Sequence, residues 1–222
     1  MDFVYKEGMA RRAQSLLLVA LAALALAVAS TASASTFVLP ANEEFKITSR
    51  PDGTGKKAHH YLASSAWSTI TCGGMSAQGV VSGKEPTQLL LEPAYSECVF
   101  GLSSSTGFKM GGCAYLFDAN GTFEIVNRPG KNCAAEPITY VASLCLISFG
   151  PQKHEGAVTY SNTSEGSFNE VTFSLGFEGL SGEAEGIACY AGPFTGFYFT
   201  GSLILKAAKA ANPLEAVNLS WK

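Results

Sequence analysis

The chain has 222 residues and a formal net charge of −3 at pH 7, with 15% charged residues and 23 glycines. Sequence-independent nucleic-acid binding depends on clustered lysine and arginine side chains, and this acidic chain has no basic cluster longer than a pair. The composition therefore excludes a general nucleic-acid-binding role and favours short strands joined by tight turns over a helical bundle.

Residues 1–34 have the three zones of a secretory signal peptide. Arg11 and Arg12 supply positive charge, residues 16–29 are leucine, alanine and valine only, and Ala32-Ser33-Ala34 fits the cleavage pattern. The apolar run is shorter than the roughly 20 residues that span a bilayer. We therefore predict cleavage after Ala34 and a secreted, extracellular protein, with loose association to the cell envelope as a further option and no stable membrane span after cleavage.

The next residues predict a flexible leader over 35–44 and an antiparallel β domain over 45–206. Alternating apolar residues predict strands, for example at 45–48 and 67–71, and an apolar strand at 88–92 is expected to stop at Pro93. The pair Asn120-Gly121 between two apolar runs predicts a hairpin with a type I′ turn, in which both turn residues have positive φ.

Later strands show the alternation most clearly. Val171, Phe173, Leu175 and Phe177 are expected to share one face of a strand, and Phe197 and Phe199 one face of another. Residues 207–222 are expected to be a C-terminal tail. Turn signals at intervals of about 8–12 residues, without an amphipathic helix, predict an all-β antiparallel β-sandwich, or as the alternative a partly closed β-barrel.

All cysteines lie beyond the predicted signal peptide. An even number of cysteines in an exported chain predicts disulfides, because the extracellular compartment is oxidising. Zinc-binding cysteines usually stand two to four positions apart, a spacing that is not found here. The spacing does not decide the connectivity, and neighbour pairing is our prediction: Cys72–Cys98, Cys113–Cys133 and Cys145–Cys189.

Candidate catalytic and metal-binding groups are sparse. His59 and His60 would point to opposite faces of a strand, and His154 is the only other histidine, so we assign no metal site. Glu183 and Glu185 have the spacing of a carboxylate pair on one strand face, but two acids beside Gly182 and Gly186 are more often a solvated turn, and no second feature of glycoside hydrolysis is present.

The sequence also has no motif that would identify a serine nucleophile. Residues 179–183 approach the G-x-S-x-G pattern around Ser181 and fail at the last position. No cofactor motif is present, and we assign no catalytic residue, cofactor or metal. A hydrolase whose site is assembled from distant loops remains the alternative function.

Aromatic residues offer the remaining candidate for a binding site. Tyr198 would face away from its buried neighbours, and Tyr190 lies close by in sequence. Exposed tyrosines on β-sheets can stack on sugars or on partner proteins. We therefore expect a non-catalytic domain that acts in extracellular binding, adhesion or the envelope, with a glycan or a cell-envelope component as the partner and no nucleic acid.

The chain contains several short motifs around its cysteines and strands: Pro93–Cys98, Gly112–Tyr115, Cys133, Cys145 with Phe149–Gln152, and Val158–Asn162. Together these motifs resemble a group of uncharacterised secreted, cysteine-containing β-rich proteins of soil-type actinobacteria. The resemblance covers roughly residues 45–206 and supplies no activity and no functional residues.

Overall fold

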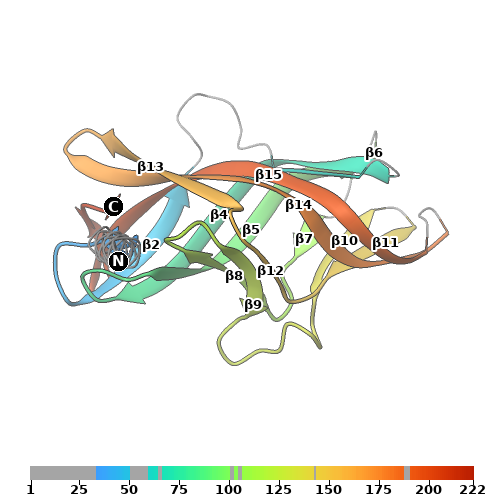
Figure 1. The fold of residues 1–222 in the computed structure, drawn as a ribbon, viewed down its shortest axis with the longest axis horizontal. Coiled ribbons are helices and arrows are strands. Elements are labelled where there is room, and N and C mark those ends of the chain that lie inside the picture. Colours follow the sequence, from blue (N-terminus) through green and yellow to red (C-terminus); the bar gives the residue numbers. More distant parts are fainter. Residues whose placement is uncertain are drawn as a thin grey trace, which may run out of the picture. The chain divides into compact units, whose positions relative to one another are not determined.

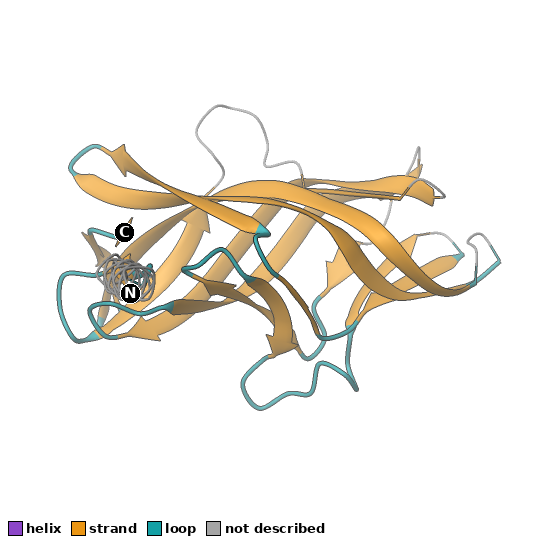
Figure 2. Cartoon of the chain, in the orientation of Figure 1, coloured by secondary structure: helices purple, strands orange, loops and turns teal. Residues whose placement is uncertain are grey.

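A computed structural model describes residues 34–50, 60–64, 67–100, 103–104, 107–142, 144–187 and 191–222. The predicted signal peptide lies outside the described residues except for Ala34, and the β unit extends from Ser35 to Lys222. Its described residues form strands and connecting loops, without a helix (Figure 2). In chain order the strands are β1 (Phe37–Val38), β2 (Glu44–Arg50), β3 (His60–Ser64), β4 (Trp67–Ser82), β5 (Gln88–Phe100), β6 (Ser103–Ser104), β7 (Gly107–Lys109), β8 (Cys113–Asp118), β9 (Phe123–Asn127), β10 (Ile138–Ala142), β11 (Cys145–Phe149), β12 (Gln152–His154), β13 (Val158–Glu165), β14 (Phe168–Glu185), β15 (Gly192–Lys209), β16 (Asn212–Val217) and β17 (Ser220–Trp221).

Nearly all of these strands belong to one antiparallel sheet. Its main path runs β12-β9-β8-β5-β4-β2-β15-β14-β11-β10-β7, while β1 and β17 form a separate pair. The sheet curls as a half-barrel (Figure 1), and its buried side chains form the core. The predicted all-β, antiparallel, disulfide-stabilised class is therefore confirmed. The curl of the sheet corresponds to the alternative prediction, a partly closed β-barrel.

The longest strand pair, β14 with β15, follows the predicted alternation. Val171 and Phe173 on β14 and Phe197 on β15 are each 0% exposed, and Phe199 is 4% exposed. Successive side chains on a strand point to opposite faces, so this pattern places one face of each strand in the core. The pairing between the strands shifts register between Phe177 and Gly182, and such irregularities bend a strand and help it to curl.

The prediction that a strand stops at Pro93 is wrong. Strand β5 continues to Phe100, with Pro93 opposite Ala77 of β4. One edge of β5 pairs with β8, and this pairing ends at Leu91. At Pro93 that edge therefore needs no backbone N–H for a hydrogen bond to β8. A proline is tolerated in a strand where no hydrogen-bond donor is required.

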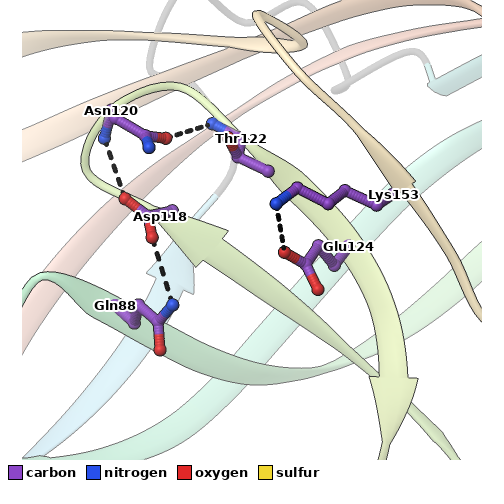
Figure 3. Close-up of polar contacts among 6 residues, drawn as sticks. All are labelled: Gln88, Asp118, Asn120, Thr122, Glu124 and Lys153. Carbon is purple, nitrogen blue, oxygen red and sulfur yellow. Dashed lines mark hydrogen bonds and ion pairs between the residues drawn. The ribbon is translucent and has the colours of Figure 1, made fainter.

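The hairpin at Asn120-Gly121 is confirmed, but its turn is not type I′. Of the two residues Asn120 and Gly121, only Gly121 has a positive φ, of 95°. The Gly121 N–H donates to the Asp118 carbonyl (2.9 Å) and the Asp118 N–H to the Thr122 carbonyl (2.9 Å), as in a three-residue loop that ends on a left-handed residue. The Asn120 side chain accepts a hydrogen bond from the Thr122 N–H, and Asp118 accepts one from the Asn120 N–H (Figure 3). These side-chain contacts favour the longer loop.

Two of the predicted disulfides are present. Cys72 and Cys98 face each other across β4 and β5, and the second bond joins Cys113 to Cys133. Cys145 is also disulfide-bonded, but its predicted partner Cys189 lies outside the described residues, so that pairing stays a prediction.

The segments expected as a flexible leader and a tail differ from that description. Phe37 and Leu39 are 0% and 1% exposed, and β1 pairs with β17. Strand β15 continues to Lys209 and pairs with β16. Phe37, Leu39 and Leu219 of these segments are buried in the core, which the local sequence pattern does not reveal. No helix in the described part of the chain is long and apolar enough to cross a membrane.

Candidate functional site

The interior of the half-barrel is lined by aromatic rings and is almost filled by them. The residual cavity measures about 10 Å³ and is bordered by residues that include Tyr95, Tyr115, Phe123, Phe177 and Phe199. This is close to the least space that one water molecule needs. The described residues around this cavity are therefore packed as a core, and the cavity itself has no room for an organic ligand.

Two tyrosine hydroxyl groups meet at this cavity. The Oη atoms of Tyr95 and Tyr115 lie 3.0 Å apart and share a hydrogen bond. Burial raises the pKa of Tyr115 to about 12 and that of Tyr95 well above its ordinary value. Both groups therefore stay neutral at physiological pH and satisfy each other within an apolar environment.

Gln152 on β12 connects the edge of the sheet to β14 through its side-chain amide. Its Oε1 accepts the Ser181 N–H (3.0 Å) and its Nε2 donates to the Ser181 carbonyl (3.0 Å). The amide thus takes both backbone groups of Ser181, as a neighbouring strand would. We call this arrangement the Gln152 bridge.

The Gln152 bridge also brings together two residues that the sequence analysis considered for catalysis. Ser181 Oγ lies 3.5 Å and His154 Nε2 lies 3.1 Å from the same Gln152 oxygen. A serine nucleophile requires a base that takes its proton directly. Here the serine and the histidine both contact an amide oxygen, which is not basic, so the arrangement does not activate Ser181.

His154 packs against aromatic rings as well. Its ring stacks on Phe177 with a centroid separation of 4.3 Å, and burial lowers its pKa. His60 lies on β3, which pairs with β4 and β15, whereas β12 pairs with β9. The structure therefore does not place these histidines on neighbouring strands, and His59 lies outside the described residues. Among the described residues, no group of three or more metal-ligating side chains is found.

The carboxylate pair considered in the sequence lies on β14. Glu183 and Glu185 are both exposed, on either side of the buried Ala184, and they share the outer face of the strand. Glu183 pairs with Ser148 of β11 and Pro193 of β15. The two carboxylates face solvent and do not border the interior.

A polar surface covers the outer side of β13, β14 and β15. Register pairs Thr159 with Ser174 and Ser174 with Ser202, so three hydroxyl side chains form a row across the strands. Neighbouring rows contribute further hydroxyl groups. We call this surface the hydroxyl face, and it consists of Thr159, Ser161, Thr172, Ser174, Gly176, Tyr198, Thr200 and Ser202.

Tyr198 is the aromatic residue of the hydroxyl face. As expected, its side chain is exposed (38%) while Phe197 and Phe199 are buried. A Cβ atom placed on Gly176 would lie 3.7 Å from the Tyr198 hydroxyl, so the ring reaches from β15 across to β14. The side chain therefore lies along the sheet, over Gly176 of β14, and shields that glycine.

The other candidate from the sequence, Tyr190, lies outside the described residues. The structure adds Phe168, at the start of β14, which is 41% exposed. Sequence reasoning missed the hydroxyl face because its rows depend on the register between three strands, although serine and threonine at alternate positions were a visible signal.

Two shallow grooves lie elsewhere on the outer surface. One measures about 400 Å³ and is lined mainly by Lys46, Gln78, Val80, Leu90 and Glu92. The other, of about 540 Å³, includes Asn127 and Asn132, whose amide oxygens already accept backbone hydrogen bonds. Neither lining includes an aromatic side chain, so the grooves offer no ring for stacking.

No known protein family, curated protein or solved structure matches this chain.

Proposed function

We propose that this protein is an exported, non-catalytic β domain that binds a glycan, in the cell envelope or the surrounding medium, through the hydroxyl face. The observation that carries the proposal is the Tyr198 side chain, exposed and laid along the sheet beside serine and threonine hydroxyl groups. Sugars present apolar C–H faces and a rim of hydroxyl groups, and this surface offers an aromatic ring next to hydrogen-bonding groups of the same kind.

Export is supported by two independent features. The first 34 residues have the zones of a secretory signal peptide. The disulfides Cys72–Cys98 and Cys113–Cys133 belong to proteins of oxidising compartments, because cytosolic thiols are kept reduced. A serine hydrolase would need a base in direct contact with its nucleophile, whereas in the Gln152 bridge Ser181 and His154 both contact the same amide oxygen.

The proposal is tested by pull-down of the purified β unit on insoluble polysaccharides, including cellulose, chitin and peptidoglycan. We expect Tyr198→Ala to weaken binding about tenfold, which corresponds to the loss of roughly 1.4 kcal/mol of stacking energy. Gly176→Val, which displaces the ring without removing it, should weaken binding similarly.

Phe168→Ala is the matched control. Phe168 is exposed like Tyr198, but it lies on β14 and is not one of the residues of the hydroxyl face. The substitution should leave binding unchanged. Equal binding by wild type and Tyr198→Ala would refute the proposal, and so would an equal loss in Phe168→Ala.

A further inference from the structure

The segment directly after the predicted cleavage point is fixed along both of its edges. We call Thr36–Leu39 the strap. On one edge the Thr36 N–H donates to the Lys222 carbonyl and the Lys222 N–H to the Thr36 carbonyl, both at 3.0 Å. On the other edge the N–H groups of Phe37 and Leu39 donate to the carbonyls of Pro86 (2.9 Å) and Lys84 (2.8 Å). The strap therefore lies between β17 and the turn that connects β4 with β5.

Side chains fix the strap as firmly as its backbone. The Phe37 ring is fully buried, with its centroid 5.3 Å from that of Tyr160 and 5.6 Å from that of Phe173. Removing a fully buried phenylalanine ring is among the most destabilising truncations in a protein core, so the docked ring holds the strap in place. The strap consequently opens rarely once the unit has folded.

The predicted cut lies immediately beside this fixed segment. Ala34 is exposed, and only Ser35 separates the Ala34–Ser35 bond from Thr36. An endoprotease holds its substrate as an extended segment on both sides of the cut and commonly bonds to the backbone edges. In the folded unit, the edges are already occupied from Thr36 onward.

We infer that the Ala34–Ser35 bond is a proteolytic processing site that closes when the strap docks, so that the predicted signal peptide is removed before folding is complete. This inference rests on the proposed export of the chain. It implies that the processing enzyme meets residues 35–39 in an extended, undocked state, and that the β unit later protects its own new amino terminus.

A sequence-specific endoprotease that accepts serine after its cut provides the test. In one variant of the full chain, its recognition hexapeptide replaces residues 29–34, so that the cut falls before Ser35. In the matched control the hexapeptide replaces residues 24–29, so that the cut falls before Ser30 and a spacer separates it from the strap. Both proteins are oxidised and folded before the protease is added.

We expect the cut before Ser35 to be about tenfold or more slower than the cut before Ser30 in folded protein, because cleavage follows the small population with an open strap. In reduced, unfolded chains the rates should be equal. Phe37→Ala in the first variant should restore fast cleavage, and Val38→Ala, which leaves the buried ring in place, should not. Equal rates for the two cuts in the folded variants that keep Phe37 would overturn the inference even if Phe37→Ala does not fold.

The mass of the secreted protein separates this inference from the proposed function. A chain that begins at Ser35 supports both. A chain that stays inside the cell with residues 1–34 attached, while the difference between the two cuts persists in vitro, would refute export and leave the protection by the strap intact. A secreted chain without that difference would refute the inference alone.

Discussion

Gln152 shows how a single side chain can take the place of a strand. Its amide has one acceptor and one donor group at the spacing that a backbone presents, and both are used by Ser181. A short β12 and a bent β14 can therefore be joined without a continuous ladder. Asn162 repeats the arrangement, since its amide accepts the Trp221 N–H (2.7 Å) and donates to the Trp221 carbonyl (2.8 Å).

Replacing the amide of Gln152 should destabilise the fold measurably. Gln152→Met keeps the length of the side chain but leaves two partly buried backbone groups of Ser181 without their partner, which we expect to lower the free energy of unfolding by about 2 kcal/mol. Urea denaturation measures the change. Gln88→Met is the control, because the hydrogen bond from Gln88 to Asp118 is exposed (Figure 3) and its loss should cost less than about 0.5 kcal/mol. Equal effects of both substitutions would contradict this account of the bridge.

His154 should make the stability sensitive to mild acid. Burial lowers its pKa in the folded state, whereas the unfolded chain keeps the ordinary value of 6.5. Above this value both states are neutral. As the pH falls through 6.5 the unfolded state binds a proton first, so the free energy of unfolding decreases until the pH passes the lowered pKa of the folded state.

The expected result is a larger loss of stability between about pH 7 and pH 5 in wild type than in His154→Gln, which carries no proton in this range. Urea midpoints at a series of pH values measure the difference. Parallel pH profiles for the two proteins would show that His154 titrates alike in the folded and unfolded states.

At the scale of the elements, each disulfide joins parts of the sheet that are already neighbours. Cys72–Cys98 ties β4 to β5, and Cys113–Cys133 ties the start of β8 to the loop after β9. Their sequence separations are 26 and 20 residues. In the chain-entropy description, each such closure stabilises the folded state by about 3–4 kcal/mol.

Cys113→Ala/Cys133→Ala should therefore lower the free energy of unfolding by about 3 kcal/mol, measured by urea denaturation under oxidising conditions. Alanine avoids a buried hydroxyl group at these fully buried positions. Cys72→Ala/Cys98→Ala should cost a similar amount, since the closed loops are of similar length. A loss below about 1 kcal/mol for either pair would indicate that the unfolded chain is already compact where the bond forms.

The sequence predicted strands well where alternation is strong and poorly where tertiary contacts decide. Phe197, Tyr198 and Phe199 could be assigned to their faces, because the period of two is a local property. Pro93 and the turn at Asn120 were misjudged, since the outcome depends on which edge of β5 is paired and on side-chain contacts from Asp118. These are properties of neighbours in space, which propensities do not contain.

For the whole β unit, the class was predictable and the arrangement was not. Composition and turn spacing indicated an antiparallel β protein, but nothing local specifies that β2 pairs with β15, where Thr48 lies opposite Lys206. The hydroxyl face shares this limitation, because it exists only when β13, β14 and β15 are in register. The interior could be foreseen as aromatic, while its near-complete filling could not.

The strap also determines how the unit responds to mechanical load. Thr36 and Lys222 are bonded to each other at the outer end of the β1–β17 pair, with Phe37 opposite Trp221 and Val38 opposite Ser220 behind them. Tension applied to these two residues would unzip the pair, so that its interstrand hydrogen bonds break one after another and not all at once in shear. Stretching would then expose Phe37 first, while the covalently tied strands β4 and β5 still resist.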